Sequence, residues 1–365
     1  MADLTDNSRT VAPCRNSSLG NVLRIRYAPT PLLAIVSVVF AAIIVLLGWK
    51  LFDWAILRAI FASDGREACM AEGAGACWSV ISNRWRLILF GLYPYEEQWR
   101  SALSCFIVFA VAALSCIPIF WHAARILPLW IGGFGLFYLF MRGGVFGLAP
   151  TFPQQWGGLS LTVFIFCSVI MLGMPMAVIL ALLRRSELPW IARTTGLFID
   201  TVRGLPLLAI LFGFAVVVPF IVAGWAQGDK LSRVIIGFSL FFACYQAEIL
   251  RGGMQAIPHG QEEAAKALGL RYRSRIGHIV LPLAFRNALP ATINQYVITF
   301  KETSLVVIIG FFDVLGSGEA AFGTADWHFA NKEVYAFLAA IFFTIAFSLS
   351  RYGAYLERRL ENRSD

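Results

Sequence analysis

The chain has 365 residues, of which 58% are hydrophobic and only 14% are charged. A water-soluble domain needs more polar surface than this, so the composition predicts an integral membrane protein. The formal net charge of +8 would suit nucleic-acid binding, but the basic residues lie mostly beside apolar runs. Membrane topology alone accounts for that placement, and we expect no nucleic-acid partner.

Eight apolar runs are long enough to cross a bilayer, since a helical span needs about 20 residues. The runs are uniformly apolar, whereas the strands of a membrane barrel alternate, so we expect helices surrounded by membrane lipid. The first run lacks a small-residue cleavage site and is interpreted as an uncleaved span. The sequence therefore predicts an all-α polytopic membrane protein with spans at about residues 30–49, 101–121, 127–148, 158–183, 204–226, 232–251, 286–314 and 334–352.

Basic residues predict how these spans are oriented. They precede span one, separate spans four and five, follow span six and close the chain, so all four groups fall on one side. Because positively charged loops stay in the cytoplasm, we expect both termini to be cytoplasmic. The groups are Arg9, Arg15, Arg24 and Arg26; Arg184, Arg185, Arg193 and Arg203; Lys266, Arg271, Arg273 and Arg275; and Arg351, Arg358, Arg359 and Arg363.

The segment between spans one and two, about residues 50–100, is predicted to lie outside. It carries as many basic as acidic residues, and its tryptophans suggest contact with the membrane interface. Packing or a lid role is the expectation for it. Cys69 and Cys77 both belong to this segment, and the sequence leaves open whether they form the disulfide that an oxidising compartment permits.

A short rigid helix is predicted at Gln261–Leu268, in the basic loop after span six. The preceding helix is halted at Pro258, and the new first turn carries acidic residues that the helix dipole favours. Glu262 and Lys266 are spaced to pair on one face. Gly269 follows as a left-handed C′ residue. Ala264, Ala265 and Leu268 leave a small apolar face that can enter a shallow cleft.

This loop also contains the pattern E-A-A, three residues, G, nine residues, I-x-L-P. The pattern resembles the EAA loop of ABC import permeases, which docks on a cytosolic ATPase; the alternative is an amphipathic loop helix resting on lipid. By this resemblance the ATPase-coupling residues are Glu263, Ala264, Ala265, Gly269, Ile279, Leu281 and Pro282.

Four further motifs occur in order along the chain. They begin at Trp156-Gly157-Gly158-Leu159, Ile199-Asp200-Thr201-Val202-Arg203-Gly204, Tyr245-Gln246-Ala247-Glu248 and Phe300-Lys301-Glu302-Thr303-Ser304-Leu305. They resemble the polar amino-acid uptake branch of the same family, with Asp200 in place of the usual Glu. The extra N-terminal spans look like a general L-amino-acid permease subunit of Gram-negative bacteria.

The resemblance implies an ABC type I importer permease core and a division of the chain. Residues 1–153 would be the N-terminal tail, three added spans and the exterior loop. Residues 154–352 would be the core, with the coupling loop at 252–285, and residues 353–365 a cytoplasmic tail. The implied function is import of L-amino acids across the bacterial inner membrane. The implied partners are ATPase subunits, a second related permease and a periplasmic amino-acid-binding protein.

Charged residues inside the spans are candidates for the substrate path. Lys301 is about 22 Å along a helix counted from Arg286, where an ionisable group is costly and normally faces a cavity or a partner. A zwitterion needs one positive and one negative contact, and a helix broken at Thr303 and Ser304 would add backbone groups. The candidates are Lys301, Glu302, Thr303, Ser304 and Asp313; the alternative is a structural ion pair.

Asp200, Arg203, Glu248 and Arg251 are expected to form structural or gate-level pairs instead. The chain contains no phosphate-binding G-x-x-x-x-G-K-[ST] loop, so it is predicted to be a transport subunit, not an enzyme. We expect no metal and no cofactor, because the sequence has no CxxC or HExxH pattern. The rival functions are a transporter driven by an ion gradient and a membrane-embedded enzyme.

Overall fold

The computed structural model describes residues 31–62, 66–222, 224, 228–324 and 326–361. Arg9, Arg15, Arg24, Arg26 and Arg363, which contributed to the predicted orientation, lie outside the described residues. The chain divides into two compact units, residues 1–79 and 80–365. Seven helices of the described part are long and apolar enough to cross a membrane, or eight if a bent pair counts as one span. The predicted all-α polytopic fold is confirmed.

The first unit consists of a long apolar helix and a short folded segment. Helix α2 (Pro31–Phe52) runs on into a π-helical turn, η1 (Asp53–Leu57), and α3 (Arg66–Cys69) follows. Cys69 and Cys77 form the disulfide that the sequence left open. Trp78 Nε1 donates a hydrogen bond of 2.8 Å to the Ala55 carbonyl, which holds the segment against the end of the span.

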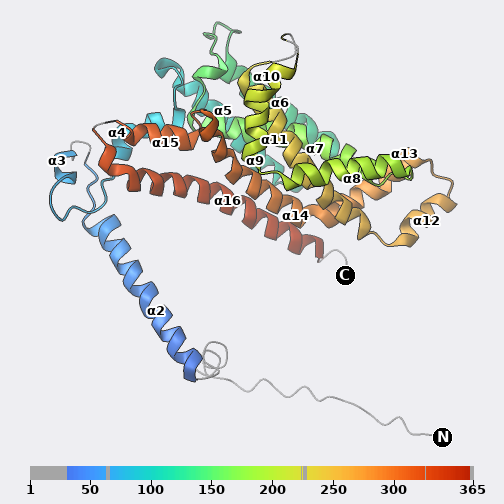
Figure 1. Cartoon of the computed structure of the whole chain (residues 1–365), viewed down its shortest axis with the longest axis horizontal. Coiled ribbons are helices and arrows are strands. Elements are labelled where there is room, and N and C mark those ends of the chain that lie inside the picture. Colours follow the sequence, from blue (N-terminus) through green and yellow to red (C-terminus); the bar gives the residue numbers. More distant parts are fainter. Residues whose placement is uncertain (1–30, 63–65, 223, 225–227, 325, 362–365) are drawn as a thin grey trace. The chain divides into compact units, whose positions relative to one another are not determined.

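The second unit is a helical bundle (Figure 1). Its principal helices are α4 (Ser79–Phe90), α5 (Gln98–Ser115), α6 (Ala123–Arg142), α7 (Gly158–Arg184), α8 (Pro189–Gly204), α9 (Leu207–Phe212), α10 (Val218–Ile221), α11 (Lys230–Gln255), α12 (His259–Ala267), α13 (Tyr272–Arg275), α14 (Leu281–Glu302), α15 (Val314–Phe322) and α16 (Asn331–Glu361).

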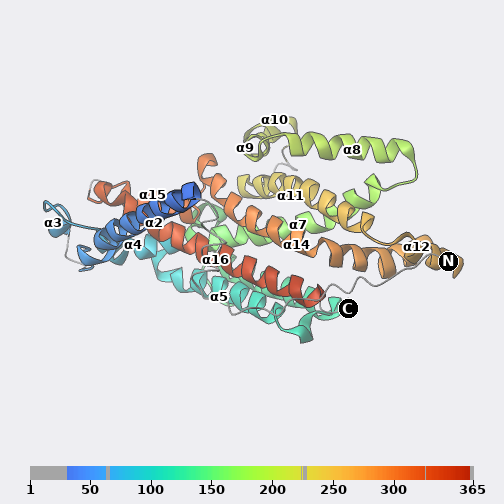
Figure 2. The ribbon, with the colours of Figure 1, turned by 90° about the horizontal axis from the view of Figure 1, so that it is seen from below.

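The core of this unit lies where α7, α11 and α14 run side by side (Figure 2). Gly173 of α7 faces the ring of Phe242 on α11, and a side chain there would approach that ring to 2.5 Å. The two helices can therefore pack closely along their length. In the same view α8 lies on one side of the three helices, and α16 and α5 lie on the other.

The fifth predicted span, at about 204–226, begins at a sharp bend that the sequence did not predict. The structure has α8 followed by the segment Leu207–Ile221, and the two are bent by 101°. The break falls at Leu205, whose backbone is extended, because the residue before a proline is disfavoured in helical geometry and Pro206 follows. The segment consists of α9, a π-helical turn η5 (Gly213–Val217) and α10.

The start of α7 and the loop before α15 are joined by close backbone contacts. Gly158 has φ +61°, and a Cβ there would lie 2.2 Å from the Leu89 carbonyl oxygen. Its amide donates to the Phe312 carbonyl at 2.8 Å, and the Val314 amide donates to Thr162 Oγ1 at 3.0 Å. This junction explains why a pair of glycines opens the helix.

Candidate functional site

The short helix predicted in the basic loop is α12, which lies beyond the ends of α11 and α14 (Figures 1 and 2). It begins after Pro258 and ends in a Schellman motif. The Gly269 amide donates to the Lys266 carbonyl at 2.9 Å, and the Leu270 amide donates to Ala265 at 3.1 Å. Gly269 has φ +70°, the left-handed conformation expected for it.

The two faces of α12 differ from the expected arrangement. Glu263, Ala264 and Leu268 are exposed, and Leu268 is 80% exposed. Ala265 is only 2% exposed and faces its own chain. The expected apolar face of Ala264, Ala265 and Leu268 is therefore wrong for Ala265, because consecutive helical residues are about 100° apart while residues four apart share a face.

The remaining residues of the coupling pattern lie where the loop returns to the bundle. Ile279 belongs to a π-helical turn, η7 (Ile276–Val280), and is half-buried. Leu281 and Pro282 open α14, where Leu281 is half-buried and Pro282 is exposed. Proline suits the first turn of a helix, where its missing amide hydrogen removes no hydrogen bond. These three residues therefore anchor the loop rather than extend its exposed face.

Glu262 carries the principal ion pairs of α12. It contacts Arg185 at the end of α7, and its Oε1 lies 3.2 Å from Arg275 Nε on α13. The four-residue spacing predicted that Glu262 pairs with Lys266, but its ion-pair partners are these two arginines. Burial alone would raise the pKa of Glu262, but the hydrogen bond and charge of Arg185, with the charges of Arg275 and Lys266, lower that pKa below its ordinary value.

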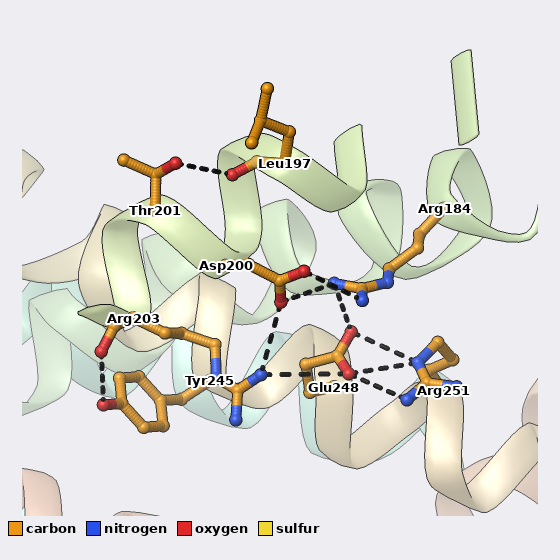
Figure 3. A network of polar contacts seen from close by, with 8 residues as sticks. All are labelled: Arg184, Leu197, Asp200, Thr201, Arg203, Tyr245, Glu248 and Arg251. Atoms are coloured by element: carbon orange, nitrogen blue, oxygen red, sulfur yellow. Dashed lines mark hydrogen bonds and ion pairs between the residues drawn. The ribbon is translucent and has the colours of Figure 1, made fainter. Parts of the chain in front are cut away.

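A second charged cluster joins three helices (Figure 3). Glu248 of α11 lies 2.9 Å from Arg251 Nη2 and 3.0 Å from Arg184 Nη1 of α7. Asp200 of α8 lies 3.1 Å from Arg184, while Arg203 lies 3.8 Å from Asp200 and 3.9 Å from Glu248. The expected pairs therefore meet in one network. Sequence reasoning missed Arg184 as a member of this network, because it had been counted only as a topology signal.

A cavity of about 680 Å³ lies between this network and α12. Its charged lining consists of Arg184, Arg185, Arg251 and Glu262, and the rest of the wall is formed by Met254, Gln255, Ile257 and Pro258. The two clusters therefore border the same space, on the side of the bundle where the coupling loop emerges.

The residues expected on the substrate path do not all come together. Lys301 is exposed and Glu302 is half-buried at the end of α14. The helix then tightens into a 3₁₀ segment, η8 (Thr303–Ile309). The hydroxyl of Thr303 donates to Phe300 at 2.7 Å, and that of Ser304 donates to Lys301 at 2.8 Å, so both serve local backbone carbonyls.

Asp313 makes a structural contact that was not predicted. It is fully buried, and its Oδ1 accepts a hydrogen bond of 2.9 Å from the Gly316 amide, which makes it the N-cap of α15. An aspartate directly before the apolar run of α15 was the available sign of this role. In the described part of the chain, no three His, Cys, Asp or Glu side chains gather where they could hold a metal ion.

A bundle of helices long and apolar enough to cross a membrane defines the chain as a polytopic integral membrane protein. Residues 169–362 match the family described as "Binding-protein-dependent transport system inner membrane component". The chain belongs to this family. The family prediction made from the motifs is thereby confirmed, as is the prediction that this chain is a transport subunit.

Two relatives match far more of the chain than this region. The chain is 38% identical over 314 residues to the Inner membrane amino-acid ABC transporter permease protein YhdY of Escherichia coli K12, covering 85% of this chain and 84% of the relative. It is 31% identical to the Glutamate/glutamine/aspartate/asparagine transport system permease protein BztC of Rhodobacter capsulatus, covering 86% and 84%. A shorter relative, the Glutamate/aspartate import permease protein GltK of Escherichia coli O6:H1, is 31% identical, covering 58% and 96%.

Among solved structures, the chain is similar to "Crystal structure of an amino acid ABC transporter with histidines". The sequence identity is 27%, the TM-score is 0.49, and the match covers 55% of this chain and 92% of that one.

Proposed function

We propose that this chain is the permease subunit of an ABC importer that carries L-amino acids across the bacterial inner membrane, driven by a separate ATPase subunit. The observation that carries the proposal is the match to YhdY and BztC over more than four fifths of the chain, since both relatives are named as amino-acid permeases. Substrate would arrive from a periplasmic amino-acid-binding protein.

In this proposal α12 docks on the ATPase. The exposed face of Glu263, Ala264 and Leu268 suits a shallow protein cleft, because it combines one charge with a small apolar surface. The Schellman motif at Gly269 stops the helix sharply, so it can act as a short rigid body. Resting on lipid is the less favourable role, because the affinity of a helix for the lipid interface grows with its apolar area, and this face offers only Ala264 and Leu268.

The core of the permease is proposed at residues 154–352, with additions before it at 1–153 and a tail at 353–365. GltK supports this division, because 58% of this chain covers 96% of that shorter permease. One copy contributes one coupling helix, whereas a transporter with two ATPase subunits needs two. We therefore expect a second, related permease as partner.

The substrate path is proposed at the end of α14. Lys301 and Glu302 offer one positive and one negative group for a zwitterion, and the described part of the chain contains no ion pair between them. The change from α-helix to 3₁₀ geometry at Thr303 is the kind of broken span on which transporter sites are built. Asp313 stays in the proposed path, because its Oδ1 caps α15 while its Oδ2 is buried with no hydrogen-bond partner among the described residues.

Both termini are proposed to be cytoplasmic, which places the disulfide-bonded segment of the first unit on the periplasmic side. The Cys69–Cys77 bond supports this placement, because disulfides persist in oxidising compartments.

The coupling role is tested by replacing Gly269. No atom lies within 4 Å of a Cβ built at Gly269, and aspartate and asparagine tolerate its left-handed backbone better than most residues. Gly269→Asp should abolish amino-acid uptake in membrane vesicles while the protein still inserts, because it places a new charge beside the docking face. Gly269→Asn is the matched neutral control and should retain most uptake. Normal uptake by Gly269→Asp would contradict docking through α12.

A further inference from the structure

Two consecutive arginines at the end of α7 contact different parts of the molecule. Arg184 reaches Glu248 and Asp200, which belong to α11 and α8. Arg185 reaches Glu262 of α12, a residue 77 positions later in the sequence. Both arginines lie in the last turn of one helix, and the Arg185 amide still donates to the Ala181 carbonyl at 3.2 Å. If a partner of either arginine moves, the movement therefore acts on the end of α7.

Glu262 is held from two directions. Arg185 approaches it from α7, and Arg275 approaches it from α13, with a side chain that is 11% exposed. Ala265, one turn further along α12, is buried against its own chain. The carboxylate of Glu262 is therefore the junction between the bundle, α12 and the returning chain.

The cavity of about 680 Å³ lies beside this junction and interrupts the packing between α7 and α12 there. Arg184, Arg185 and Glu262 all line it, so open space adjoins the contact between α7 and α12. Where apolar packing is interrupted, an ion pair with hydrogen-bonding geometry is the contact that can carry a displacement.

We infer that Arg185 is a positioning residue of the transport cycle. Through Glu262 it ties the coupling helix to the end of α7, so that a movement of α12 driven by the ATPase is passed to α7 and, through Arg184, to α8 and α11. This inference rests on the proposed function, because it assumes that α12 docks on an ATPase. It adds a residue outside the E-A-A pattern to the coupling machinery.

The strength of the contact sets the expected phenotype. The side chains of Arg185 and Glu262 are 35% and 23% exposed, so the pair is partly screened by solvent. Its loss should leave the fold and the binding of the ATPase intact and should weaken the transmission of movement.

The experiment measures uptake and ATP hydrolysis by the purified complex in proteoliposomes. Arg185→Ala and Glu262→Gln should each lower the amount of amino acid moved per ATP hydrolysed by about two- to fivefold. Arg185→Lys keeps the charge and should retain most of the ratio. The double variant should be no worse than Glu262→Gln alone, because Glu262→Gln already breaks the contact that Arg185→Ala removes. Arg193→Ala removes a nearby exposed arginine of α8 and should leave the ratio unchanged.

Three results would overturn the inference: an unchanged ratio in both single variants, multiplied effects in the double variant, or less ATPase co-purifying with Arg185→Ala. The last result would mean that Arg185 maintains the docking surface and does not transmit its movement. Failure of the proposed function is distinguishable, since the wild-type complex would then show no ATP-driven uptake before any variant is compared.

Discussion

Glu262 illustrates how a single carboxylate can link a loop to a membrane bundle. Its pKa lies below the ordinary value because the hydrogen bond and charges of its basic neighbours outweigh the effect of burial. A lowered folded-state pKa means that the ionised group stabilises the folded loop. This contribution is complete above the unfolded-state pKa of about 4.3 and is lost as pH falls through the folded-state pKa.

We therefore predict that α12 is held less tightly in acid. Hydrogen exchange of the amides in residues 259–270, corrected for the intrinsic effect of pH, should show constant protection above about pH 5 and at most about fivefold less at lower pH. Glu262→Gln should show the lower protection throughout this range. Equal pH profiles for the two proteins would contradict the role assigned to the carboxylate.

At the scale of elements, the network around Glu248 holds α7, α8 and α11 together. The side chain of Glu248 is 12% exposed and faces Arg184, Arg203 and Arg251. Removing its charge leaves three guanidinium groups that repel one another in a partly buried place. Asp200 is far more exposed and shares only two of these partners.

Glu248→Gln should accordingly lower the free energy of unfolding by about 2 kcal/mol. Thermal unfolding of the purified protein in detergent would measure this as a lower midpoint. Asp200→Asn is the matched control and should shift the midpoint much less, since solvent already screens that carboxylate. A larger shift for Asp200→Asn than for Glu248→Gln would contradict the central position of Glu248.

The sequence predicted elements well where one physical rule dominated. Long apolar runs identified the spans, and Gly269 marked the end of α12. The prediction failed where a local rule competed with tertiary structure. The spacing of Glu262 and Lys266 favoured a pair within α12, but arginines from α7 and α13 are the actual partners. Pro206 was interpreted as the entry to a span and does start a new helix, but the 101° bend before it was not predicted.

Contacts between distant segments could not be predicted from the sequence. Nothing in the chain's periodicity places Arg184 beside both Asp200 and Glu248, because long-range pairs depend on how the helices pack. The role of Asp313 was accessible in principle, since an acidic residue before an apolar run is a helix-start signal. Its charge within an apolar region instead suggested a role in the substrate path.

At the scale of the whole molecule, the orientation in the membrane has a direct test. The disulfide between Cys69 and Cys77 is proposed to face the periplasm. After mild reduction of spheroplasts, a membrane-impermeant maleimide should label the wild-type protein more strongly than the Cys69→Ser, Cys77→Ser double variant. In inside-out vesicles this difference should disappear. A difference seen only in inside-out vesicles would reverse the proposed orientation.

The central claim is that this chain moves solute with energy supplied by another subunit. It is tested most directly by identifying the proteins that co-purify with the chain. The C-terminally tagged protein should be purified gently from its native membranes and the accompanying chains identified by mass spectrometry. We predict an ATPase subunit with a phosphate-binding loop and a second, related permease. A monodisperse chain that comes alone and still binds amino acids would contradict the account, and would direct attention to Lys301 and Glu302 as parts of an ion-coupled transporter.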